Sequence, residues 1–257
     1  DLVTSTISLN GLIDFPNTSS LTPFLGLGIG SSKVEVSGAD DNVTSVNVIA
    51  GVSYKLTEKV DLVGKYNYRR FSDITLGNFT GGSVTVTGPA VLKDAVTVDA
   101  DASDGSISFS STINNDDSGT ARNLTLTTGT GSISVGGIIG DVANSGVAIG
   151  VIDINKTSGT GAITLAGIGS ASAAGNAGTV DIGNTTTLDL NLAGTFFTGG
   201  TTNFKAEDDN SGSDENIDIT ATTTIKTSSS DIIFTDSAID IADNANLTIN
   251  AGSGDVT

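Results

Sequence analysis

The stretch that decides the fold of the N-terminal part is Val60-Asp-Leu-Val-Gly-Lys-Tyr-Asn-Tyr-Arg69. Its residues fall into two alternating sets. One is apolar or small (Val60, Leu62, Gly64, Tyr66 and Tyr68), and the other is mostly polar or charged (Asp61, Val63, Lys65, Asn67 and Arg69). Successive side chains of a β-strand point to opposite faces of the sheet. A period of two therefore predicts a strand with one apolar face and one polar face.

Three segments upstream alternate in the same way, at 3–15, 21–36 and 45–54. Short turns at 16–20 and 56–60 and a polar loop at 38–42 join the four segments. Long alternating strands joined in this manner are typical of outer-membrane β-barrels, and a soluble up-and-down sheet is the alternative. The Tyr and Phe residues near the strand ends favour the membrane, because aromatic side chains gather at its two interfaces.

Three stretches resemble the opacity/OmpA-like eight-stranded outer-membrane barrels and related rickettsial-type surface antigens. They are Leu21-Thr-Pro-Phe-Leu-Gly-Leu-Gly-Ile-Gly30, Ala50-Gly-Val-Ser-Tyr-Lys-Leu-Thr-Glu-Lys-Val-Asp-Leu62 and Tyr66-Asn-Tyr-Arg-Arg70. The resemblance covers residues 1–76 and implies strands four to seven of eight, with a periplasmic turn at 56–60. It also implies that the chain leaves the membrane on the extracellular side at 72–77. The barrel would need further strands, because open edges cannot be tolerated in lipid.

Composition changes near Gly77. The net charge of the chain is −18. Residues 1–79 carry six basic and eight acidic side chains, whereas residues 80–257 carry five basic and 21 acidic ones. Such an acidic surface repels phosphate backbones, so we expect no nucleic-acid partner. The chain has no Cys and no His. Ser-His-Asp and Cys-His nucleophilic sites and ordinary zinc sites are therefore excluded.

Residues 80–257 contain a repeat. Asn123-Leu-Thr-Leu-Thr-Thr-Gly-Thr-Gly-Ser-Ile-Ser134 aligns with Asn246-Leu-Thr-Ile-Asn-Ala-Gly-Ser-Gly-Asp-Val-Thr257, and glycines precede β-branched strands at Gly105, Gly131 and Gly161. Short strands bounded by turn residues, with apolar residues at matched places, predict a parallel β-solenoid. The segment resembles filamentous-haemagglutinin-like and autotransporter adhesin passengers, which implies a right-handed β-helix. A β-sandwich array of Thr/Gly-rich repeats is the alternative.

Candidate sites are few. The densest cluster of oxygen ligands is a weak Ca²⁺ candidate formed by Asp208, Asp209, Asn210, Asp214 and Glu215. A solvated loop explains it better, because its Gly stands at the fifth position and not at the sixth of an EF-hand loop. Other carboxylates alternate singly with apolar residues, and no catalytic pair stands out (Asp153, Asp181, Asp189 and Asp218). We expect no catalytic residues and no cofactor.

The sequence thus predicts an all-β chain with two domains. Residues 1–79 form antiparallel strands of a partial barrel, and residues 80–257 form a parallel β-solenoid. The predicted function is a non-enzymatic bacterial surface protein with an adhesin-like interaction or display role. The alternatives are a porin-type outer-membrane protein and a secreted carbohydrate-active β-helix enzyme. The expected partners are the outer membrane through residues 1–76, an unidentified host or cell-surface ligand, and other copies through open strand edges. The solenoid is expected to lie outside the cell.

Overall fold

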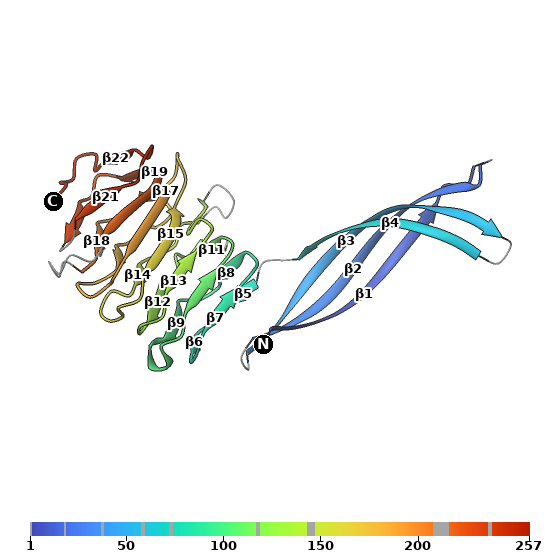
Figure 1. Cartoon of the computed structure of the whole chain (residues 1–257), viewed down its shortest axis with the longest axis horizontal. Helices are drawn as coiled ribbons and strands as arrows, with labels where there is room; N and C mark the ends of the chain where they lie inside the picture. Colours follow the sequence, from blue (N-terminus) through green and yellow to red (C-terminus); the bar gives the residue numbers. More distant parts are fainter. Residues whose placement is uncertain are drawn as a thin grey trace. The chain divides into compact units, whose positions relative to one another are not determined.

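The computed structural model describes residues 2–17, 19–36, 39–57, 60–71, 74–116, 119–142, 147–207, 216–235 and 238–257. The chain divides into two compact units, Asp1–Ile74 and Thr75–Thr257. Both consist of β-strands (Figure 1). Among the described residues, helix is limited to the 3-10 turn Asp101–Ser103 and to Val142. The predicted all-β class is confirmed.

The first unit is one antiparallel sheet with the strand order β1-β2-β3-β4. Its strands are β1 (Leu2–Asp14), β2 (Leu21–Val36), β3 (Ala39–Thr57) and β4 (Val60–Phe71). All four predicted strands are present. The predicted polar loop at 38–42 is wrong from Ala39 onward, because β3 begins there and pairs with the end of β2. Ladder pairing outweighs the weak strand preference of Asp and Asn in this segment.

The second unit is a β-solenoid whose strand pairs are all parallel among the described residues. Each coil contributes to three ladders. The first ladder contains β7 (Val84–Val86), β10 (Ile107–Phe109), β13 (Ile133–Val135), β15 (Ile163–Ile168), β17 (Leu190–Thr198), β19 (Ile217–Thr227) and β21 (Ile239–Ile241). The third contains β6 (Phe79–Thr80), β9 (Val96–Ala100), β12 (Leu124–Thr128), β14 (Ile152–Ile154), β16 (Val180–Ile182), β18 (Thr202–Lys205) and β20 (Ile232–Thr235).

The second ladder changes character along the solenoid. It starts with the separate strands β5 (Ile74–Leu76), β8 (Ala90–Leu92) and β11 (Ile113–Asn115). Single bridges through Ile139 continue it. It then uses the C-terminal halves of β15, β17 and β19, which bend at register shifts, and ends at β22 (Leu247–Asn250). Long strands thus turn a corner in the later coils, where the earlier coils use two short strands.

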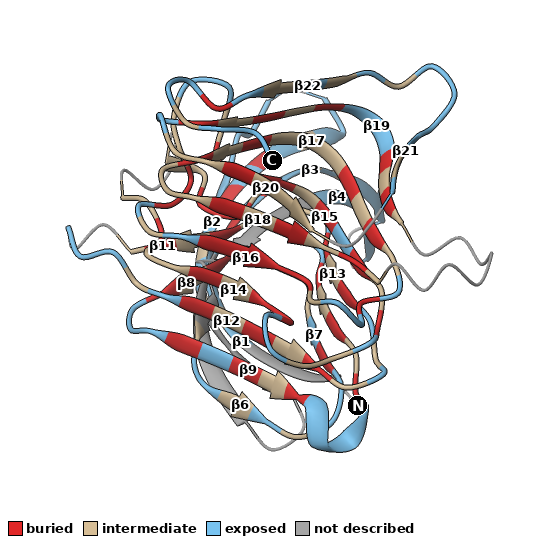
Figure 2. Ribbon diagram, turned by 90° about the vertical axis from the view of Figure 1, so that its left-hand side faces the viewer, coloured by how far each residue is buried: buried red, intermediate tan, exposed pale blue. Residues whose placement is uncertain are grey.

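The core consists of apolar columns inside the coils (red in Figure 2). One column follows the first ladder with side chains stacked in register, namely Val84, Ile107, Ile133, Ile163, Leu190, Ile217 and Ile239. All of these except Ile239 are buried. Each buried side chain of this kind stabilises the fold by about 1.5–3 kcal/mol. Because each coil buries its residues against its neighbours, the solenoid is a one-dimensional stack.

The recurring glycines form a column of their own at one corner. A Cβ atom on Gly131 would overlap the carbonyl group of Gly105, and one on Gly161 would overlap that of Gly131. Backbone therefore packs directly on backbone from coil to coil, and only glycine fits. The predicted repeat signal at these three positions reflects this close approach.

Candidate functional site

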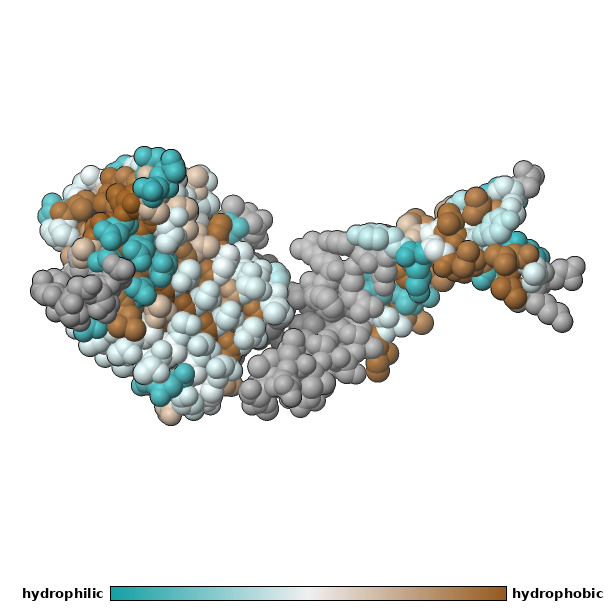
Figure 3. Space-filling view, viewed as in Figure 1, coloured by the Kyte–Doolittle hydropathy of each residue, from teal (hydrophilic) through white to brown (hydrophobic). Residues whose placement is uncertain are grey.

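The first unit exposes a continuous apolar surface on one side of its sheet. Along every strand, residues of this surface, called the apolar face below, alternate with residues of the opposite face. The side chains of the apolar face are strongly exposed, as for Ile7 at 82%, Leu9 at 79% and Tyr66 at 71%. Exposed apolar residues are visible on this unit in Figure 3 (brown). The apolar face includes Ile7, Leu9, Ile13, Leu21, Leu25, Leu27, Ile29, Val46, Val48, Val52, Tyr54, Leu62 and Tyr66. Apolar surface of this extent marks a membrane or protein contact.

The opposite face of the sheet, called the polar face below, is lined mainly by small and polar residues, with Leu12, Phe24, Ile49 and Val63 among them. Asn47 is fully buried there, and its amide nitrogen donates a hydrogen bond to Oδ1 of Asn10 at 2.7 Å. Asn10 occupies the space that a side chain at Gly28 would need, and the ring of Phe24 does the same over Gly51. Side chains folded over glycines are expected inside a small barrel, where little lumen is available. Gly26, Gly28 and Gly51 are thus positions on this face where no side chain would fit.

In the solenoid, the third ladder brings together two carboxylates that the sequence does not pair. Asp153 and Asp181 are direct neighbours in β14 and β16. Lys156 bridges them, with its Nζ 3.4 Å from Oδ1 of Asp153 and 2.8 Å from Oδ2 of Asp181. Asn203 donates to the other oxygen of Asp181 at 3.0 Å. Both oxygens of Asp181 therefore have partners, and the cluster links three successive coils.

The charge state of Lys156 follows from this geometry. Its hydrogen bond to Asp181 is the main cause that raises its pKa above the ordinary 10.5, and the nearby charges of Asp181 and Asp153 add to this effect. Desolvation acts in the opposite direction and is outweighed. At neutral pH the cluster therefore carries a fixed cation between two stacked anions. This is the pattern of a structural ion-pair bridge.

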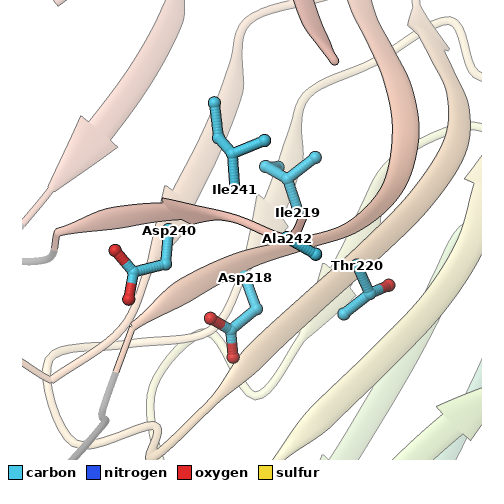
Figure 4. Close-up of a pocket in the computed structure, with 6 residues that line it drawn as sticks. All are labelled: Asp218, Ile219, Thr220, Asp240, Ile241 and Ala242. Carbon is cyan, nitrogen blue, oxygen red and sulfur yellow. The ribbon is translucent and has the colours of Figure 1, made fainter. Parts of the chain in front are cut away.

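A second carboxylate pair lies at the C-terminal end of the first ladder. Asp218 and Asp240 are ladder neighbours, and both point to the same side of the strands (Figure 4). They line a shallow hollow of about 450 Å³ together with Ile219, Thr220, Ile241 and Ala242. Asn216 donates to Oδ2 of Asp240 at 3.1 Å. Asp189 lies at the corner before β17 and is in neither carboxylate pair.

The Ca²⁺ candidate Asp208, Asp209, Asn210, Asp214 and Glu215 lies outside the described residues. Within the described part of the chain, no three acidic residues come close enough together to hold a metal ion. No helix in that part has the length and apolar character needed to cross a membrane.

The sequence contains a signal for the Asp153–Asp181 pair only in retrospect. Both belong to short Ile/Val-Asp-Ile segments, at 152–154 and 180–182, and two further such segments are at 217–219 and 239–241. Which of these segments become neighbours depends on coil length, which varies. The step from Ile133 to Ile163 takes 30 residues, whereas the step from Ile217 to Ile239 takes 22. Sequence reasoning missed the pair for this reason.

Comparison with known proteins gave one family. The model of the outer membrane protein beta-barrel domain matches residues 1–87, which span β1 to β4 and continue through β7 of the second unit. Neither the curated proteins nor the solved structures contain a match. The sheet of the first unit, with one apolar and one polar face, agrees with this family. Residues 1–87 are thus similar to outer-membrane β-barrel domains, and the chain joins this barrel-like segment to a β-solenoid.

Proposed function

We propose that this chain is a surface-display protein without catalytic activity, whose first unit sits in the bacterial outer membrane and whose solenoid presents an adhesin-like interaction surface outside the cell. The observation that carries the proposal is the segregation of faces in β1 to β4. Exposed apolar side chains from all four strands share one face, while the Asn10–Asn47 hydrogen bond lies on the other. A soluble sheet would have to cover that apolar face.

The anchoring part is tested by placing the same charge on each face of the sheet. Leu27 in β2 belongs to the apolar face. Leu12 in β1 belongs to the polar face and pairs with Gly26, the residue next to Leu27. Both side chains are exposed, at 64% and 57%. An Arg on the lipid face near the bilayer midplane costs about 2–4 kcal/mol, whereas a lumen position tolerates it.

We therefore expect Leu27→Arg to abolish or strongly reduce membrane insertion of the full chain and Leu12→Arg to retain it. Insertion is measured as resistance of the first unit to protease in lipid vesicles. Equal insertion of the two variants would show that the apolar face does not contact lipid.

The display part is supported by the chemistry of the solenoid. Its outward side chains are predominantly Ser, Thr, Asn and Asp, as along the first ladder at Thr85, Ser108, Ser134, Thr164 and Asn191. Residues 80–257 carry five basic and 21 acidic side chains. A largely apolar core beneath a hydrophilic, acidic surface suits a module in an aqueous medium.

The absence of cysteine in the natural chain allows a direct test of location. Thr164 is exposed, and its neighbour Ile163 is fully buried. On intact cells, a membrane-impermeant maleimide should label Thr164→Cys and leave Ile163→Cys unlabelled. If Thr164→Cys reacts only after the outer membrane is permeabilised, the solenoid is periplasmic and extracellular display is refuted.

One observation favours a second candidate, a carbohydrate-active enzyme. Glycoside hydrolysis commonly uses two carboxylates, and Asp218 and Asp240 face the same hollow. Asp240 is already bonded to Asn216, which favours a structural role. Turnover of an acidic polysaccharide that is lost in both Asp218→Asn and Asp240→Asn would replace the display proposal with this one.

A further inference from the structure

The match to the barrel family extends into the solenoid. It covers residues 1–87, whereas the first unit ends at Ile74. In the structure, residues 75–87 make up most of the first coil of the solenoid, which contains β5, β6 and β7 (Figure 1). The same residues are thus similar to a barrel in sequence and belong to a solenoid in the fold.

The sequence of this segment alternates as a barrel strand does. Leu76, Val84 and Val86 share one parity, and the residues between 76 and 86 on the other parity are Gly, Ser or Thr, apart from Phe79. As one continuous strand, the segment would therefore have an apolar side and a side of mainly small residues. Gly88-Pro89 follows directly, and proline cannot donate a hydrogen bond to a ladder. The strand would end there.

The length of the segment fits β4. Three residues separate Phe71, the last residue of β4, from Thr75, and hairpin connections of three residues are common. With this connection Phe71 pairs with Thr75, and the antiparallel register continues residue by residue. It gives the pairs Val60–Val86, Asp61–Thr85, Leu62–Val84, Val63–Ser83 and Lys65–Gly81. The family match thus ends one residue beyond the partner of Val60, the residue at which β4 begins.

The two faces of the sheet agree with this register. Partners in an antiparallel pair point to the same side of the sheet. Val84 would therefore extend the apolar face beside Leu62, and Ser83 would extend the polar face beside Val63. A register shifted by one residue would place Val84 and Val86 on the polar face.

β4 offers an edge for this segment, and the first coil can release it. Among the described residues, β4 pairs only with β3. If the first unit lies in the membrane as proposed, on which this inference rests, the backbone groups at the other edge of β4 need a partner strand. The first coil stacks on one neighbouring coil, through β8, β9 and β10. Val84 is buried there, but Leu76, Phe79 and Val86 are only partly buried.

We propose that residues 75–87 have two structural states. In one state they form the first coil of the solenoid, as in the structure. In the other state, adopted when the first unit is inserted into a membrane, they pair with β4 as a further antiparallel strand, and the solenoid begins at β8. The states exclude each other, because Val84 cannot pack inside the coil and face lipid at the same time.

The experiment uses engineered cysteine pairs in the full chain, which has no cysteine of its own. The strand pair, Val63→Cys with Ser83→Cys, reports pairing with β4. The coil pair, Thr85→Cys with Ser108→Cys, reports the first coil, because these two residues are ladder neighbours in β7 and β10. In the matched control for the strand pair, Leu62→Cys on the apolar face replaces Val63→Cys. Val63, Ser83 and Thr85 are exposed in the structure, so their substitution leaves the core intact.

After insertion into lipid vesicles and mild oxidation, the strand pair should form at least tenfold more disulfide within one chain than the control. The thiol of Leu62→Cys points to the other side of the sheet and cannot reach its partner. The coil pair should form at least tenfold less disulfide in vesicles than before vesicles are added. Mass spectrometry of linked peptides measures both yields. Mixing copies with two different tags identifies links between chains, and a doubly tagged product of the strand pair would overturn the proposal.

The outcomes separate this inference from the proposed function. A first unit that is protected from protease in vesicles without both tenfold changes in yield overturns the two-state segment and leaves the membrane anchor standing. A chain that is not protected at all overturns the anchor, and the two-state segment with it. Protection together with both changes supports the anchor and the two states.

Discussion

Removing the ring of Phe196 is the perturbation that best tests the core of the solenoid. This side chain is fully buried in the second half of β17. Its ring meets that of Phe204 edge to face, with centroids 6.0 Å apart and an interplanar angle of 84°. Phe204 in turn stacks on Phe234 at 5.4 Å. The rings of β17, β18 and β20 thus contact one another in series within the later coils.

The magnitude follows from these contacts. Truncation of a buried Phe to Ala typically costs about 3–5 kcal/mol, including the cavity that remains. Of this, the edge-to-face pair contributes about 0.5–1.5 kcal/mol. The next residue, Phe197, faces outward and lies under Lys226, whose Nζ is 4.2 Å from the ring centroid. Losing that cation–π contact costs about 0.5–1 kcal/mol.

Phe196→Ala and Phe197→Ala are therefore matched variants, one inside the coil and one outside. Amide hydrogen exchange of β17 and its neighbours in the full chain reports the free energy of local opening. About 1.4 kcal/mol corresponds to a tenfold change, so Phe196→Ala should lower protection by about two to almost four orders of magnitude, and Phe197→Ala by less than about tenfold. Equal losses in the two variants would refute the assignment of inward and outward faces.

Three further outcomes are expected. Gly131→Ala should destabilise the coils by about 1–3 kcal/mol because its Cβ overlaps the carbonyl of Gly105, whereas Gly82→Ala, with open space around it, should not; urea unfolding of both variants checks this. The pKa of Lys156 is raised in the folded state, so the stability that its ion pairs contribute should be complete below pH 10.5 and be lost as the pH rises through the folded value. Hydrogen exchange in β14 and β16 should show this pH-dependent loss of protection in the unsubstituted chain and not in Lys156→Gln. Asn47→Leu should weaken the first unit by leaving Asn10 without its partner, while Val48→Leu on the apolar face should be neutral in vesicles; protease resistance distinguishes the two.

Period-two alternation was enough to predict the architecture of the first unit. It identified four strands and assigned their residues to faces, because alternation is a local property of the chain. It failed at Asp40 and Asp41, which lie in β3 and not in a loop. Their strand conformation comes from pairing with the end of β2, and no local preference of Asp signals such pairing.

The solenoid was predictable as a class and not in detail. Short strands and recurring glycines predicted stacked coils, and the structure places Gly105, Gly131 and Gly161 in one column. The similar segments 123–134 and 246–257, however, occupy different ladders, since β12 belongs to the third and β22 to the second. Two strands joined by a glycine-containing turn can form any corner of a three-sided coil. Local sequence similarity therefore predicts this strand–turn–strand unit but not the ladder that each strand joins.

The Asp153–Lys156–Asp181 bridge illustrates the same limit for sites. Lys156 and Asp153 are three residues apart and visible in the sequence, but Asp181 arrives from the next coil. Its position depends on the lengths of the intervening loops, which follow no fixed period. A site made from separate coils requires the register between them, and only the folded chain supplies that register.

The variable coil length and the glycine column together have a genetic consequence. Removing the residues from Ile133 to Ala162 would place Ile163 directly beside Ile107 in the ladder. Gly161 would be lost, but Gly131 would remain stacked on Gly105, so the glycine column would stay continuous there. Each coil adds only about 4.8 Å of height. In-frame duplication or loss of whole coils should therefore be tolerated, and a gene built this way can change the length of its product in small steps without having to evolve a new core.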